Sequence, residues 1–147
     1  MINSGWKLAA VAVGMFAAGF AARGTMATDV AYAQGANRVF EMRTYTANPG
    51  KFDALKARFR DHTIKLFEKH GMTNIGYWIP ADGEKANNTL VYILAYPSRE
   101  AAKKSWAAFG ADPDWQKARA ESEKDGAILV GRPESVYLNP ADFSTIK

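Results

Sequence analysis

The chain has 147 residues, 48% of them hydrophobic, and its formal net charge is +4. This length suits a single domain, and the absence of cysteine excludes disulfides, thiolate catalysis and zinc sites built on cysteine. Acidic residues are interleaved with the basic ones, whereas a nucleic-acid-binding surface shows a basic stripe with exposed aromatic side chains. We therefore expect one globular domain that does not bind nucleic acid.

Residues 1–33 have the pattern of a bacterial secretory signal peptide. Lys7 precedes the uncharged apolar run Leu8–Ala22, and Ala31-Tyr32-Ala33 is an A-x-A cleavage site. The apolar run is shorter than the roughly 20 residues that cross a bilayer. We predict cleavage before Gln34, export to the periplasm or the medium, and no membrane attachment afterwards. Because the segment between the apolar run and the cleavage site is long, an uncleaved N-terminal anchor is the alternative.

The mature chain, residues 34–147, is expected to begin with a strand at Val39–Thr46, where side chains of different character alternate. Two sets of three therefore point to opposite sides of this strand: Phe40, Met42 and Thr44 on one, and Glu41, Arg43 and Tyr45 on the other.

A turn and a long helix should follow this strand. Asn48 and Pro49 suit a helix cap and a first helical residue, and Gly50 permits a tight turn. From Phe52 onward, apolar residues recur at helical spacing until Gly71 ends the helix.

The rest of the chain gives three strands and two helices. Strands are expected at Thr73–Pro80, Thr89–Tyr96 and about Glu134–Leu138, with a loop at Ala81–Asn88. Ser98 should cap a helix in which Ala102, Trp106 and Phe109 share a face, and Asp112-Pro113 should start a short helix that continues through Ser122.

This order predicts an α+β, ferredoxin-like βαββαβ domain with one four-stranded antiparallel sheet and its helices on one face. The strand Thr89–Tyr96 is apolar at nearly every position, as in strands that are covered on both sides. Because two helices cover only one side of such a sheet, we expect a second copy of the chain to cover the other in a homodimer.

Several segments together resemble a NIPSNAP domain. They are FEMRTYT with its Pro-Gly turn, the helix end FEKHGM, then GYW, VYILAY, SWAAF, DPDWQ and a closing Leu-Asn-Pro, which span about Arg38–Pro140. The resemblance implies the dimeric α/β-barrel superfamily, whose ferredoxin-like protomers pair face to face. That superfamily includes small monooxygenases, haem-degrading enzymes and proteins with no known activity, and the resemblance brings no catalytic set with it.

Glu41, Arg43 and Tyr45 form the first candidate site. If Phe40 and Met42 pack against the helices, these three residues face the barrel interior between protomers. Arg43 would then offer a fork of donors to a carboxylate or phosphate, and Glu41 could act as an acid or base if burial raised its pKa. The alternative is a structural ion pair at the dimer interface.

His62, Trp78 and Trp106 complete the candidate ligand site. His62 flanks the apolar stripe of the long helix and could reach a cavity, but it lies two turns from His70, so no metal site is expected. Trp78 and Trp106 could wall an apolar pocket, although tryptophan at helical spacing is more often part of a core.

The favoured hypothesis is an exported dimer whose barrel cavity binds a small anionic or aromatic molecule. One alternative is a cofactor-independent oxygenase or a haem-handling enzyme, in which His62 would be the axial ligand of the haem. The other is a structural dimer with a filled barrel. The sequence assigns no cofactor.

Overall fold

The computed structural model describes residues 38–147, so the expected signal peptide lies outside the described residues. The element order is β1 (Val39–Thr46), α2 (Phe52–Arg58), η1 (Phe59–Thr63), α3 (Ile64–Lys69), β2 (Thr73–Trp78), η2 (Glu84–Asn87), β3 (Thr89–Tyr96), α4 (Arg99–Ala111), α5 (Pro113–Ser122) and β4 (Glu134–Leu138). The expected strands and helices are all present, and β2 ends two residues before Pro80.

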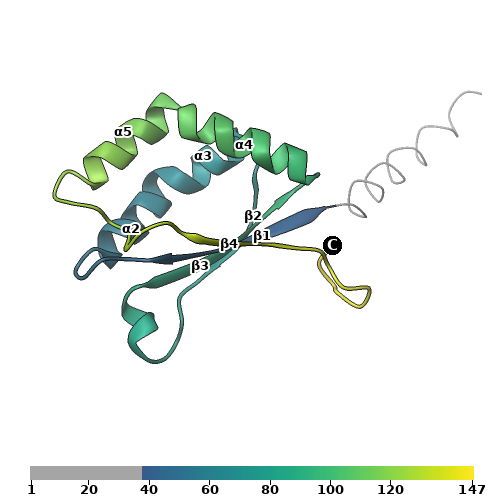
Figure 1. Cartoon of the computed structure of the whole chain (residues 1–147), viewed down its shortest axis with the longest axis horizontal. Coiled ribbons are helices and arrows are strands. Elements are labelled where there is room, and N and C mark those ends of the chain that lie inside the picture. Colours follow the sequence, from purple (N-terminus) through teal and green to yellow (C-terminus); the bar gives the residue numbers. More distant parts are fainter. Residues whose placement is uncertain (1–37) are drawn as a thin grey trace, which may run out of the picture.

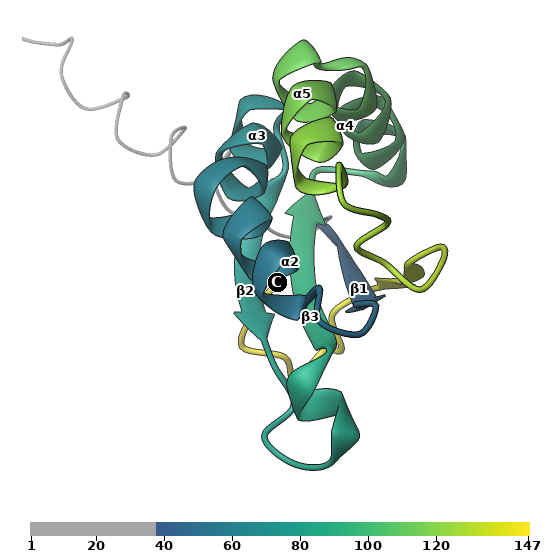
Figure 2. The ribbon, with the colours of Figure 1, turned by 90° about the vertical axis from the view of Figure 1, so that its left-hand side faces the viewer.

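One antiparallel sheet with the strand order β2-β3-β1-β4 organises the domain. All the long helices cover the same face of this sheet, and the opposite face carries none (Figure 1). Turned by 90°, the molecule shows α2 and α3 beside α4 and α5 above the strands (Figure 2). This is the predicted ferredoxin-like α+β fold. Among residues 38–147, no helix is long and apolar enough to cross a membrane.

The long helix predicted from Phe52 contains a π turn, η1, between α2 and α3. A π turn adds a residue to a helical turn and shifts the faces that follow it. Within this turn Thr63 is buried, with its Oγ1 donating to the Arg58 carbonyl at 3.1 Å, whereas His62 is exposed.

The helix ends test the capping predictions. Ser98 and Asp112 cap α4 and α5 as expected, accepting hydrogen bonds from the amides of Ala101 at 3.1 Å and Asp114 at 2.8 Å. The cap predicted at Asn48 is wrong, because α2 begins only at Phe52.

The Asn48 amide instead ties the β1–α2 turn to the loop before β4. Its Nδ2 donates to the carbonyls of Ala127 at 2.9 Å and Leu129 at 3.0 Å. Gly50 and Gly71, with φ of +73° and +74°, make the turn and end the helix as predicted.

The core between the sheet and the helices is built from aromatic rings around Tyr92, which is fully buried. Tyr77 stacks on Tyr92 with 5.5 Å between ring centroids, and Phe59 and Tyr45 meet it edge to face, each at 5.2 Å. Such pairs add about 0.5–1.5 kcal/mol each beyond the area they bury. Tyr45 therefore packs in the core of one protomer.

The arrangement in which Phe40 and Met42 pack against the helices is not the one the structure has. Phe40, Met42 and Thr44 lie on the face without helices, and Glu41, Arg43 and Tyr45 face the helices. Most paired residues that extend this open face are apolar, namely Val91, Ile93, Val136 and Leu138, and Glu134, which pairs with Thr44, is charged. Phe40 is nevertheless buried, because residues 139–147 fold beside it around an apolar hollow of about 400 Å³.

Candidate functional site: a cationic cleft beside Glu41

Glu41, at the centre of β1, is only 1% exposed and accepts hydrogen bonds from four side chains. Its Oε1 accepts from Arg43 Nη1 at 2.7 Å and Ser135 Oγ at 2.6 Å. Its Oε2 accepts from Trp106 Nε1 at 2.7 Å and Tyr96 OH at 2.9 Å. Both oxygens are thus fully used, and the carboxylate connects β1, β3, β4 and α4.

Burial alone would raise the pKa of Glu41. The hydrogen bonds from Ser135 and Trp106, the charge of Arg43 and the bond from Tyr96 outweigh it, and the pKa lies below its ordinary value. The condition for Glu41 as a general acid or base is therefore not met. It is an ionised anchor that fixes its neighbours.

Arg43 is held from two sides. One of its terminal nitrogens pairs with Glu41, and its guanidinium lies 4.2 Å from the ring centroid of Trp106. Burial would lower the pKa of Arg43, but Tyr45, Tyr92 and Glu41 raise it above its ordinary value, so the cation persists. The side chain is 17% exposed, and its buried Nε has no hydrogen-bond partner among residues 38–147. Its Nη2 makes no hydrogen bond within these residues and is not buried, so this nitrogen remains available to an anion.

A cleft of about 760 Å³ opens beside this pair, between the β1–β4 edge of the sheet and α4. We call it the cationic cleft. Four cationic and two anionic side chains line it, together with four others: Arg43, Arg99, Lys103, Arg132, Glu41, Glu100, Trp106, Pro133, Ser135 and Tyr137. Arg99 lies over the ring of Tyr137, 4.2 Å from its centroid. The excess of positive charge and the two stacked guanidiniums make this an anion-binding geometry.

The structure separates the six predicted site residues. Glu41, Arg43 and Trp106 meet at the cationic cleft, whereas Tyr45 lies behind them in the core. Trp78 is on the open face of edge strand β2 and is 50% exposed, with its ring over Gly76. Trp78 and Trp106 therefore wall no common pocket.

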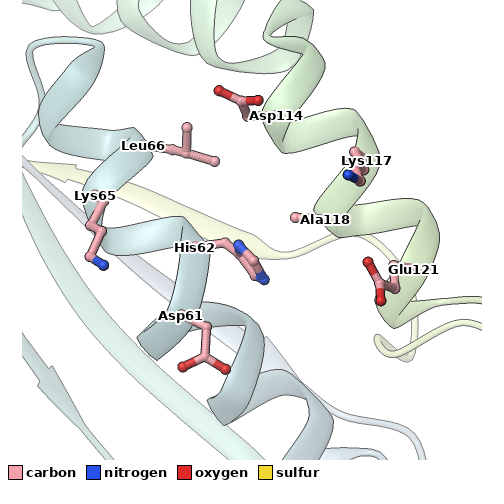
Figure 3. A pocket seen from close by; sticks show the side chains of 8 residues that line it. All are labelled: Asp61, His62, Lys65, Leu66, Asp114, Lys117, Ala118 and Glu121. Atoms are coloured by element: carbon pink, nitrogen blue, oxygen red, sulfur yellow. The ribbon is translucent and has the colours of Figure 1, made fainter.

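His62 lies in a different hollow, of about 390 Å³, between η1–α3 and α5. Figure 3 shows its ring pointing from the π turn toward α5, whereas Lys65 points away from α5. Most of the lining side chains are charged and exposed, which does not suit an apolar macrocycle such as haem: Asp61, Lys65, Asp114, Lys117 and Glu121. Residues 38–147 contain no group of three histidine or acidic side chains placed to hold a metal ion.

Sequence reasoning missed seven residues of the cationic cleft: Arg99, Glu100, Lys103, Arg132, Pro133, Ser135 and Tyr137. Two weak signals existed. Arg99 and Lys103 are four apart on one helix, and Ser135 and Tyr137 alternate on one strand. The β1–β4 register brings Ser135 and Tyr137 to the site, because Tyr137 pairs with Glu41 and Ser135 with Arg43.

The fold is a ferredoxin-like α+β domain whose second sheet face carries no helix within residues 38–147. The pattern that defines the NIPSNAP family matches residues 40–145, and the chain belongs to this family. A NIPSNAP family protein from Agrobacterium tumefaciens is similar, with 25% identity and a TM-score of 0.64 over 76% of this chain and 96% of its own. A NIPSNAP-like domain protein from Burkholderia xenovorans has 24% identity and a TM-score of 0.63 over 74% and 90% of the two chains.

More distant relatives share the fold alone. A monooxygenase-like protein from Nitrosomonas europaea has 16% identity and a TM-score of 0.50, covering 69% of this chain and 97% of its own. No curated protein matches the chain significantly.

Proposed function

We propose that this protein is an exported, homodimeric binding protein for small anions, and that each protomer holds its ligand in the cationic cleft. The single observation that carries the proposal is Arg43. Its charge is held by Glu41 and Trp106 at the wall of the cleft, and within the described part of the chain only its Nη1 has a hydrogen-bond partner. A guanidinium that lines a cleft with terminal donors left uncommitted supports the binding of an anion there.

An anion fits the cleft better than an aromatic ring does. The guanidinium of Arg43 occupies one face of Trp106, and Phe67 and Phe109 meet the same indole edge to face at 5.4 Å and 5.6 Å between centroids. Arg99 in turn covers a face of Tyr137. An aromatic ligand would have to displace these cations, whereas an anion would bind to them.

Binding also fits the cleft better than acid–base catalysis does. Glu41 is ionised and all its acceptor positions are occupied. Its neighbour Tyr96 has a pKa raised by burial and by Glu41, so it holds its proton. Neither group is poised to exchange a proton near neutral pH. A fold shared with a monooxygenase-like protein does not by itself assign a reaction.

The homodimer is proposed from the open face of the sheet. Trp78 and Val136 are each 50% exposed there, next to the half-buried Met42, Val91 and Ile93. A continuous apolar face of this kind is typical of an interaction surface, and a second copy presents a matching one. Because the cationic cleft lies on the other side of the sheet, a fully packed dimer interface and a ligand cleft are compatible.

The test of anion binding is a thermal-unfolding comparison of wild type and Arg43→Lys in phosphate and in chloride at equal ionic strength. We expect phosphate to raise the wild-type Tm by several degrees, since ligand at about 100 times its Kd adds about 2.7 kcal/mol. Arg43→Lys keeps the charge but loses the fork of donors, so its shift should be much smaller. The control is Lys104→Gln, an exposed cation on α4 outside the cleft lining.

If phosphate and acetate both leave the wild-type Tm unchanged at millimolar concentration, the anion-binding proposal fails. Should Arg43→Lys not fold, Arg132→Gln replaces it, because Arg132 is exposed and lines the same cleft. Export is tested separately by the intact mass of protein recovered from the producing cell. Cleavage after Ala33 gives the mass of residues 34–147, and a full-length, membrane-retained species would contradict it.

A further inference from the structure

We propose that the ligand of the cationic cleft is a small dianion with an anionic group at each end, one bound by Arg43 and the other by Arg99. This inference rests on the proposed function and narrows it to a ligand class. A linear dicarboxylate is the simplest member of that class.

Two guanidiniums, from different elements, are each held against an aromatic ring at one cleft. Arg43 comes from β1 and lies 4.2 Å from the Trp106 ring centroid. Arg99, the first residue of α4, lies 4.2 Å from the Tyr137 ring centroid. Contact with an aromatic ring holds each guanidinium near that ring, and a guanidinium offers a carboxylate a planar fork of donors. Two such forks make two separate anion positions.

The lining of the cleft carries more positive than negative charge. Of its four cations, Arg43 is paired with Glu41. Glu100 is exposed at the rim and can offset one more. Two positive charges therefore remain without a negative partner in the lining. A ligand with two negative charges neutralises this excess, whereas a monoanion leaves part of it and a neutral ligand leaves all of it.

Arg43 and Arg99 lie at different depths in the cleft. Arg43 is 17% exposed and belongs to the wall, whereas Arg99 is an exposed side chain of α4 that reaches Tyr137 at the β4 edge. One end of the ligand would therefore lie against the sheet and the other near the rim. The volume of about 760 Å³ leaves room for a short chain between them.

The experiment measures the affinities of acetate, succinate and sulfate by calorimetry at constant ionic strength and pH 7.5. Succinate is expected to bind at least about tenfold more tightly than acetate, because it adds a second charge-assisted contact. Sulfate carries the same charge as succinate in compact form, so it should bind more weakly than succinate. Arg99→Gln should reduce the succinate-to-acetate preference to about twofold or less, and Lys104→Gln should keep it.

The outcomes separate this inference from the proposed function. Equal affinities for succinate and acetate, or for succinate and sulfate, would overturn two-point recognition while leaving an anion site. An unchanged preference in Arg99→Gln would remove Arg99 from the second position and overturn the inference as stated. If none of the three anions binds the wild type, the proposed function itself falls.

Discussion

At the centre of β1, the two faces of the sheet differ in the reverse of the usual way, although the rest of the helix-covered face is a hydrophobic core. On β1, the residues that face the helices include the ion pair Glu41–Arg43, and those that face away from them are Phe40, Met42 and Thr44. In a monomer with one covered face, apolar residues would face the helices and polar residues the solvent. Here the covered face carries a buried charge with all its hydrogen bonds made, and the uncovered face is apolar.

This inversion has a physical consequence for each face. A buried carboxylate is tolerated only when paired and hydrogen-bonded, so Glu41 fixes the positions of Arg43, Trp106, Ser135 and Tyr96 at one point. The uncovered apolar face gains stability only when something else covers it. One face therefore carries the candidate site within a single chain, and the other carries the proposed dimer surface.

The largest expected effect comes from breaking the polar face. Glu41→Ala leaves the Arg43 cation and three other donors without their acceptor, and it should cost about 3–5 kcal/mol of unfolding free energy. Denaturant unfolding measures this loss. The control is Glu84→Ala, an exposed glutamate on η2, which should change stability by no more than about 0.5 kcal/mol. Equal losses in the two variants would show that the Glu41 contacts contribute little.

The next effect comes from placing a charge on the apolar face. Val136→Arg puts an unpaired cation at the proposed interface twice per dimer, so dimer affinity should fall about a hundredfold or more. Light scattering at micromolar concentration should show the wild type at about twice the protomer mass and the variant shifted toward one. Val130→Arg is the matched control, because Val130 is also an exposed valine (61%) but lies outside the sheet strands. A monomeric wild type would contradict the dimer.

The smallest effect is a difference in acid sensitivity. Because the pKa of Glu41 is lowered on folding from about 4.5, its contribution is present above that value and is lost as the pH falls through the folded-state pKa. Wild-type stability should therefore fall more steeply below about pH 4.5 than that of Glu41→Gln. Asp112 and Glu123 also have lowered pKa values and contribute to the acid sensitivity of both proteins. The test is therefore the difference between wild type and Glu41→Gln in how the free energy of unfolding changes with pH below about 4.5. If the free energy of unfolding falls equally steeply in both proteins, Glu41 does not contribute to the acid sensitivity.

Sequence alone determined the elements and their order, because the signals for these are local. Alternation marked Val39–Thr46, and a nearly continuous apolar run marked Thr89–Tyr96. Ser98 and Asp112 cap the helices that follow them. From that order came the ferredoxin-like sheet, and from the doubly apolar β3 came the expectation of a partner for its second face. Sequence also selected Glu41 and Arg43, because an acid and a cation share one face of the first strand, and Trp106, as a possible wall of a pocket.

Tertiary structure alone decided which side of β1 faces the helices and where the cleft lies. Alternation sorts residues into two sets but is symmetric between them, and only the packing of α4 against the sheet breaks that symmetry. Glu41 and Ser135 are 94 residues apart and meet because β1 pairs with β4 in one register, which no local pattern specifies. The π turn that contains His62 likewise depends on how the whole helix packs. Local forces thus determined the elements, and the long-range pairing of those elements made the site.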